Sequence, residues 1–264
     1  MDYFISCLYG DLNAYKKIKK SLTEFDNLWI IGDIFDGNTK HPEYCIDIFK
    51  DICRSPNIHL ILGDHEYFHA MRLFAETEEE RDMWEESLIE CDISGKPLVD
   101  YLNSLSEEEQ MSIGKYLLGT EVSDMLKFGN NFFYVCHGCP NFRTKVRNGN
   151  MQWQLDVVTG YPEFDKDYGS EISSDIHMED FSKKYGEISL RKNLITIMGH
   201  VPNYMLRQEG VKWITPDNNQ NMAFICQDRK INLNQNITAD DNYHGPRYLL
   251  GIDAAGFIVK DVEV

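Results

Sequence analysis

Residues 28–33 read Leu28-Trp29-Ile30-Ile31-Gly32-Asp33, an unbroken apolar run closed by a glycine and an aspartate. Such a run, without alternation, is typical of a strand buried on both faces. Residues 58–62 form a second run of this kind and end at Gly63 and Asp64. Between and before these runs, residues 12–22 and 42–52 carry apolar side chains at helical spacing. Strands that alternate with helices predict an α/β fold with parallel strand pairing.

The rest of the chain predicts a helical insert and a return to strands. Helical patterns dominate from residue 67 to about residue 130, and residues 141–193 are polar and irregular. Ser106 and Glu109 have the spacing of a helix-capping box. We expect one domain over residues 1–264. Further strands are expected at residues 3–5, 131–136, 195–198, 212–215, 222–226 and 248–253, the last three antiparallel.

The charge balance limits the kinds of molecule that the protein can bind. The chain has 26 Lys and Arg residues against 43 Asp and Glu residues, a net charge of −17. An acidic protein lacks the basic surface that a nucleic-acid duplex or an anionic membrane requires. The acidic runs at 76–90 and 107–109 are either solvated faces or a surface for a basic partner. A phosphorylated ligand would need a local cation, most simply a metal ion.

Several features of the sequence also indicate the cellular compartment of the protein. No apolar run approaches the roughly 18–20 residues that span a bilayer. The first residues lack the basic region of a signal peptide, and the seven cysteines are an odd, scattered set. We therefore expect reduced thiols and a cytoplasmic protein.

Polar side chains follow several of the predicted strands. Ligands of open α/β sheets bind beyond the carboxyl ends of the strands, so these side chains should converge. Two carboxylates and two imidazoles suit a borderline divalent cation such as Zn, Mn or Fe. The predicted metal ligands are Asp33, Asp64, His137 and His200.

The ordered set of motifs resembles that of the metallophosphoesterases, the superfamily of calcineurin-like enzymes and phosphoprotein phosphatases, in a divergent form of bacterial type. The segment 161–166 is similar to a segment of small bacterial phosphatases. The motifs are Gly32-Asp33-Ile34-Phe35-Asp36-Gly37, Gly63-Asp64-His65-Glu66, His137-Gly138 and Gly199-His200-Val201-Pro202. The resemblance implies two packed mixed β-sheets flanked by helices, with a helical insert at about 67–130. It also implies that a metal-activated hydroxide attacks phosphorus, while His65, backed by Asp36, protonates the leaving oxygen.

The first motif departs from the family pattern. The family has Asp-x-His-Gly where this chain has Cys7-Leu8-Tyr9-Gly10, so both ligands that the first metal takes from this motif are absent. Cys7 and Tyr9 are therefore degenerate first-metal positions, and Cys7 is either a soft-metal ligand or a small buried side chain. Asp64 replaces the family asparagine. We expect one metal per chain.

The phosphate-binding arginine after the second motif is also missing, because Gly37 and Asn38 stand there. Arg143 is a candidate replacement, and its alternative is an exposed, solvated side chain. His69 and Asp11 are expected at the surface.

Two functions follow. The first is a metal-dependent phosphoester hydrolase with a single-metal site, acting on a phosphorylated small molecule, a nucleotide or a phosphoprotein. The alternative is a catalytically dead pseudophosphatase that serves as a binding or scaffolding protein.

Overall fold

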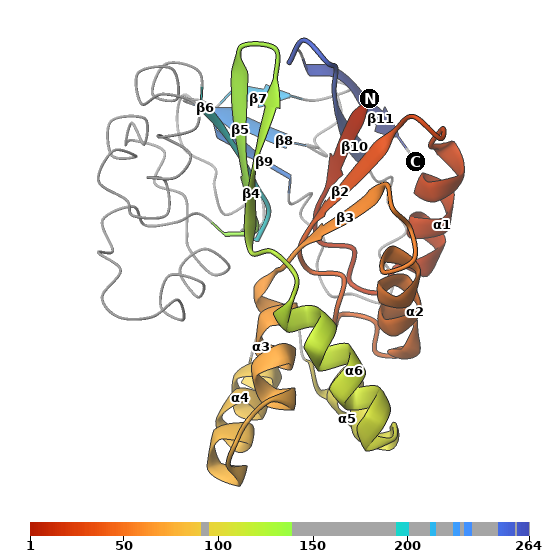
Figure 1. The fold of residues 1–264 in the computed structure, drawn as a ribbon, viewed down its shortest axis with the longest axis vertical. Coiled ribbons are helices and arrows are strands. Elements are labelled where there is room, and N and C mark those ends of the chain that lie inside the picture. The colour runs from red at the N-terminus through yellow and green to blue at the C-terminus, as the bar shows by residue number, and fades with distance from the viewer. Residues whose placement is uncertain are drawn as a thin grey trace.

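Two mixed β-sheets pack face to face in the computed structural model of this chain (Figure 1). The structure describes residues 1–90, 95–138, 194–200, 212–214, 224–227, 230–233, 248–256 and 258–263. The five-stranded sheet has the order β11 (Ile258–Glu263), β10 (Tyr248–Ile252), β1 (Asp2–Ile5), β2 (Asn27–Ile31) and β3 (Ile58–Ile61). The six-stranded sheet has the order β4 (Ser123–Phe128), β5 (Asn131–Cys136), β6 (Leu194–Met198), β9 (Lys230–Asn232), β8 (Phe224–Gln227) and β7 (Lys212–Ile214).

The strand directions confirm the predicted pairing. Strands β1, β2 and β3 are parallel, as are β5, β6 and β9. Strand β10 runs antiparallel to β1 and β11, and β7 runs antiparallel to β8. The parallel strands of both sheets therefore deliver their carboxyl ends to one edge of the sandwich.

Apolar side chains fill both faces of the five-stranded sheet. Phe4 and Ile31 lie between the two sheets, where they join a buried cluster that includes Phe133 and Ile197 of the other sheet. Helices α1 (Leu12–Ser21) and α2 (Glu43–Ile52) cover the opposite face (Figure 1). This two-layered sheet sandwich with flanking helices confirms the predicted fold class.

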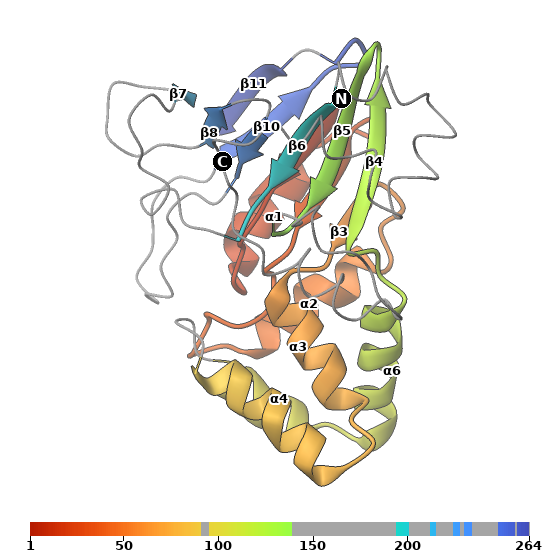
Figure 2. The same ribbon diagram turned by 90° about the vertical axis from the view of Figure 1, so that its left-hand side faces the viewer.

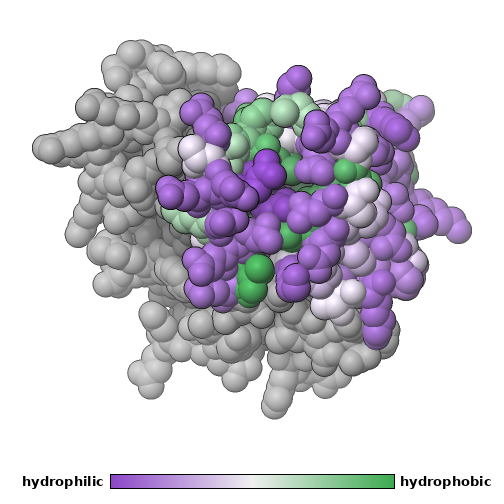
Figure 3. Space-filling model, turned by 90° about the horizontal axis from the view of Figure 1, so that it is seen from below, coloured by the Kyte–Doolittle hydropathy of each residue, from purple (hydrophilic) through white to green (hydrophobic). Residues whose placement is uncertain are grey.

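Four helices extend beyond the carboxyl ends of the strands: α3 (Asp64–Leu73), α4 (Glu78–Glu90), α5 (Lys96–Ser104) and α6 (Glu107–Leu118) (Figure 2). Helix α6 begins with the predicted capping box, because Ser106 Oγ accepts from Glu109 N and the Glu109 carboxylate accepts from Ser106 N. The buried Arg72 connects three of these helices by donating to Glu85 and Asn103. Seen from below, this end of the molecule is largely hydrophilic (Figure 3).

The boundaries of the helical region were predicted less well. Helix α3 begins at Asp64, so the motif residues form its first turn. The helical region ends at Leu118, and residues 123–128, which were predicted as part of it, form strand β4. Strands β9 and β11 were not predicted. The predictions for residues 141–193, including Arg143 and segment 161–166, lie outside the described residues.

Candidate metal centre

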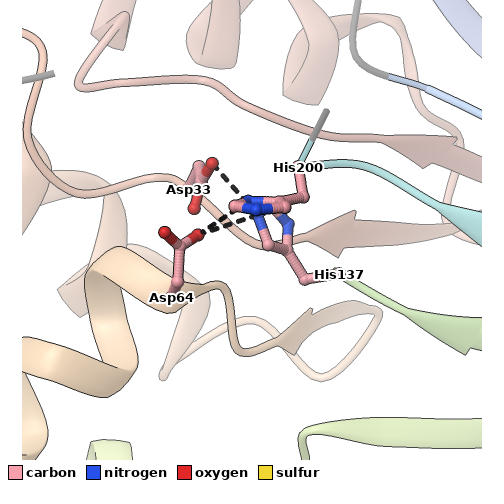
Figure 4. Close-up of side chains that lie close together, drawn as sticks. All are labelled: Asp33, Asp64, His137 and His200. Atoms are coloured by element: carbon pink, nitrogen blue, oxygen red, sulfur yellow. Dashed lines mark ion pairs between the residues drawn. The ribbon is translucent and has the colours of Figure 1, made fainter. Parts of the chain in front are cut away.

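Four side chains from four different strand ends converge on one point (Figure 4). Asp33 follows β2, Asp64 follows β3 at the start of α3, His137 follows β5, and His200 follows β6. One ligand atom of each lies within 4.8 Å of all the others. The two aspartates and His137 are buried, and the side chain of His200 is 18% exposed. The structure thus brings together the four residues predicted as metal ligands.

Glycines allow these segments to approach closely. A Cβ atom on Gly63 would collide with Asp33 Oδ1, and one on Gly32 would collide with His137 Nδ1. The backbone is strained as well, because Asp33 and His200 have φ values of 57° and 59°. A left-handed conformation costs a non-glycine residue on the order of 1–3 kcal/mol, and such residues cluster at functional sites.

Glu66 fixes the loop that carries Asp33. Its Oε2 accepts from the backbone N–H groups of Asp33 and Gly63, both at 2.9 Å, and its Oε1 accepts from Phe35 N at 2.7 Å. The side chain is fully buried. No role was predicted for Glu66, although its position in a polar cluster directly after a strand indicates a place near the site.

The tautomer of His137 is set by its backbone contact. His137 Nδ1 lies 2.8 Å from the carbonyl oxygen of Ile31, which can only accept, so Nδ1 carries the proton. Nε2 faces Asp33 Oδ2, 3.1 Å away, and Asp64 Oδ1, 3.2 Å away. Burial alone would lower the pKa of His137, but these two carboxylates outweigh it and hold the pKa well above its usual value when no metal is bound. A lone pair that faces two carboxylates in a buried site is repulsive unless a cation or a proton lies between them.

The contacts among these atoms fit a metal ion better than hydrogen bonds. Asp33 Oδ1, Asp64 Oδ1 and His137 Nε2 are buried and make no hydrogen bond within the described part of the chain. His200 Nδ1 lies 3.2 Å from Asp64 Oδ1. The ligand atoms of a tetrahedral zinc ion lie about 3.3 Å apart, given metal–ligand distances of about 2.0–2.1 Å. A carbonyl-bound imidazole with carboxylate neighbours is also the usual environment of a histidine ligand.

The two degenerate positions of the first motif also face Asp33. Tyr9 donates its hydroxyl hydrogen to Asp33 Oδ2 at 2.9 Å, and Cys7 Sγ lies 3.6 Å from the same oxygen. Burial, and then the Asp33 charge, raise the pKa of the Cys7 thiol to about 12. When no metal is bound, this thiol keeps its proton at neutral pH and can donate it to Asp33 Oδ2. Tyr9 and Cys7 therefore act on Asp33 as hydrogen-bond donors.

The predicted acid pair is formed. His65 Nδ1 lies 2.7 Å from Asp36 Oδ2, and both side chains are buried. Burial alone would raise the pKa of the Asp36 carboxyl, but His69 and His65 outweigh it and lower this pKa to about 2. Asp36 is thus a carboxylate at neutral pH, and it can accept the Nδ1 proton of His65.

The prediction that His69 and Asp11 lie at the surface is wrong for His69 and only partly right for Asp11. His69 is fully buried and contacts Asp36, because it lies one helical turn after His65 on the same face of α3. Asp11 is half-buried, and its carboxylate caps α1 by accepting from Ala14 N.

Comparisons with known proteins identify the family of this chain. Residues 3–233 match the family model of the calcineurin-like phosphoesterases. A solved protein assigned as a diadenosine tetraphosphatase is 12% identical with a TM-score of 0.52, and the match covers 99% of this chain and 92% of the other. A serine/threonine phosphatase from Saccharomyces cerevisiae is 10% identical with a TM-score of 0.51, covering 100% and 79%. At these identities the two structures are similar in fold alone.

No curated protein matches the chain. Within the described residues, no helix is long and apolar enough to cross a membrane. The family model extends over nearly the whole chain, and its strand-end motifs carry the convergent carboxylates and imidazoles. The protein therefore belongs to the calcineurin-like phosphoesterase family, whose members are hydrolases that act on phosphoester bonds.

Proposed function

We propose that this protein hydrolyses a phosphoester at a site that holds one divalent transition metal ion, Mn, Fe or Zn. Its ligands would be Asp33, Asp64, His137 and His200. The observation that carries the proposal is the position of His137 Nε2, which the Nδ1 contact to Ile31 directs at two buried carboxylates. A metal ion at this point would be coordinated by His137 Nε2 and by both carboxylates.

The contacts of Asp33 support one metal ion in place of the family's two. Asp33 is the residue that would bridge two metals, yet its Oδ2 accepts from Tyr9 and is also close to Cys7. Two protonated side chains thus lie where a second ion would need ligands. With a single divalent ion, the two aspartates would leave this centre close to neutral, so phosphate binding would depend on donors elsewhere.

The ion, His65 and Asp36 would each have a distinct role in the hydrolysis. The ion, when bound, would acidify a water molecule and offset the charge of the phosphoryl group. His65 would protonate the leaving oxygen from Nε2, because its Nδ1 is committed to Asp36. Asp36, ionised and buried, would hold the ring and stabilise the charge that His65 carries before it donates.

The substrate would be a phosphorylated small molecule, a nucleotide or a phosphoprotein. The proteins of similar fold are named as a diadenosine tetraphosphatase and a serine/threonine phosphatase, so nucleotides and phosphoproteins are both candidate substrates. We also propose that the chain is one domain with a helical insert. We propose a cytoplasmic location, which is supported by Cys45 and Cys53, since these form no disulfide within the described residues.

The test is hydrolysis of phenyl phosphate, whose leaving oxygen needs a proton, by protein purified without chelator and supplied with manganese. Turnover is expected in the wild type and should disappear in Asp33→Asn and in His65→Ala. Asp82→Asn, at an exposed position of α4, is the matched control and should retain full activity.

The second candidate function is a pseudophosphatase that binds a partner without turnover. The observation that favours it is the hydrogen bond from Tyr9 to Asp33, which takes the place of a metal contact. Absence of turnover across Mn, Fe and Zn and across aryl phosphates, nucleotides and phosphopeptides would support this alternative over hydrolysis.

A further inference from the structure

The buried carboxylate of Asp36 contacts a second histidine in addition to His65. His69 Nε2 lies 2.9 Å from Asp36 Oδ1 and 3.2 Å from Oδ2, while His65 Nδ1 lies 2.7 Å from Oδ2. The side chains of Asp36 and His69 are inaccessible to solvent, and that of His65 is 6% exposed. His65 and His69 are four residues apart on α3, so both rings lie on one face of the helix.

The proton positions follow from what a carboxylate can do. Asp36 is ionised and only accepts, so the facing nitrogens, Nδ1 of His65 and Nε2 of His69, must both carry protons. The other nitrogen of His69, Nδ1, is buried and has no hydrogen-bond partner among the described residues. The polar contact of His69 within the described part of the chain is therefore directed at Asp36.

The surroundings of Asp36 leave its carboxylate little freedom to rotate. A Cβ atom on Gly95, at the start of α5, would lie 3.0 Å from Asp36 Oδ2. On the other side, the ring of Phe35 packs edge-on against the His69 ring, with 5.5 Å between centroids. With Oδ1 bound to His69, Oδ2 is the oxygen that remains for His65.

Packing alone does not explain a histidine at this position. A fully buried imidazole costs free energy unless its polar atoms are bonded, and an apolar side chain would fill the same space without that cost. A buried carboxylate also has more acceptor capacity than one imidazole N–H can use. His69 supplies the missing donor.

We propose that His69 is a positioning residue for the proton-donating pair: it holds Asp36 so that Oδ2 fixes the ring orientation of His65 and keeps a proton on its Nδ1. The inference rests on the proposed hydrolytic function for its kinetic consequence, and on geometry alone for its structural one. Loss of His69 should impair reactions whose leaving oxygen needs a proton and spare those whose leaving group departs as an anion.

The kinetic test compares two substrates in metal-loaded wild type, His69→Phe and His69→Gln. Phenyl phosphate needs a proton on its leaving oxygen, whereas 2,4-dinitrophenyl phosphate does not. In His69→Phe, kcat for phenyl phosphate should fall on the order of 10- to 100-fold, the size of effect expected for a supporting contact to a proton donor. Its kcat for the dinitrophenyl ester should stay within about threefold of wild type. Equal losses on both substrates would show a merely structural role and overturn the proposal.

His69→Gln is the rescue variant, because its amide nitrogen can occupy the place of the imidazole Nε2 and donate to Asp36. It should recover most of the activity on phenyl phosphate. A Gln variant that is as impaired as the Phe variant, despite the same melting temperature as wild type, would contradict the requirement for a donor.

A second test needs no turnover. Long-range ¹H–¹⁵N spectra of zinc-loaded protein report which nitrogen of each histidine carries the proton. His65 Nδ1 should carry a proton throughout in the wild type and in His69→Gln, and only part of the time in His69→Phe. An unchanged His65 signal in His69→Phe would overturn the proposal even in a protein that hydrolyses nothing. The absence of wild-type turnover, by contrast, would refute only the proposed function.

Discussion

The hydroxyl of Tyr9 donates a 2.9 Å hydrogen bond to Oδ2 of Asp33, the oxygen that also lies 3.1 Å from His137 Nε2. Tyr9 reaches it from a strained loop in which Tyr9 and Cys7 have φ values of 46° and 59°. The loop of the first motif thus brings Tyr9 and Cys7 against Asp33, and both side chains contact it as hydrogen-bond donors. A single Asp33 oxygen thus links the degenerate first motif to the retained ligands.

Restoring the family residues at the first motif should add a metal ion. The double variant Cys7→Asp, Tyr9→His replaces two donors with a carboxylate and an imidazole, both good ligands for divalent metals. Elemental analysis of chelator-free protein should rise from about one equivalent to about two, and any phosphatase activity should rise with it. Tyr9→Phe, which removes only the hydroxyl, is the control and should stay at one. A double variant that also stays at one would mean that the loss of the first metal has another cause.

Glu66→Gln should loosen the loop that carries Asp33. The carboxylate accepts three backbone N–H groups, and an amide would turn an N–H toward at least one of them. Burial, and then the Asp33 charge, raise the pKa of Glu66 to about 7, so the comparison is made at about pH 8, where the side chain is ionised. Hydrogen bonds to a charged group contribute about 1.5–3 kcal/mol each, so the free energy of unfolding should fall by about 2–4 kcal/mol in urea titrations. Zinc affinity, measured by calorimetry, should weaken about 10- to 100-fold. Glu79→Gln, at an exposed position of α4, should change neither quantity, and equal stability of the two variants would rule out this role for Glu66.

The ionised state of Asp36 should make the protein acid-sensitive. Its pKa is lowered from 3.8 to about 2 in the folded protein. A lowered folded-state pKa means that the stabilisation is present above the unfolded value and is lost as the pH falls through the folded value. The shift corresponds to about 2 kcal/mol, at 1.36 kcal/mol for each pH unit.

The measurement compares the wild type with Asp36→Asn, both stripped of metal, from about pH 5 to about pH 2. The difference between their free energies of unfolding should shrink by about 2 kcal/mol over this range. A difference that does not depend on pH would contradict the assignment of a carboxylate held by His65 and His69.

Arg72 should couple the helices of the insert. Its guanidinium is 2% exposed and donates through Nε to Glu85 Oε2 at 2.9 Å, while Glu85 itself is 30% exposed. A cycle of Arg72→Met, Glu85→Gln and the double variant should give a coupling energy of about 1–2 kcal/mol, less than for a fully buried pair because solvent screens Glu85. A coupling near zero would mean that the ion pair with Glu85 does not join α3 to α4.

The sequence predicted the strand ends well because their physical signals are local. The apolar runs before Asp33 and Asp64 can only be buried strands, and the parallel topology then brings their ends together with those before His137 and His200. Strand β4 was missed because Met125 is its one buried residue, so the strand lacks the apolar run that marks the buried strands.

Other features could not be predicted from local patterns. His69 is four residues from His65, which predicts that both lie on one face of a helix. Whether the His69 side chain is buried, however, depends on how α3 packs beside Asp36. Glu66 binds backbone groups of residues 33, 35 and 63, a role that emerges only once two strand ends are adjacent.

The account depends most on a cation held by Asp33, Asp64, His137 and His200. Anomalous diffraction from crystals of chelator-free protein, recorded on both sides of the Mn, Fe and Zn absorption edges, tests it most directly. We expect one peak within bonding distance of all four side chains, and no peak in crystals of Asp33→Asn. A wild-type map without a peak at this point, or with the four side chains turned away from one another, would contradict the account.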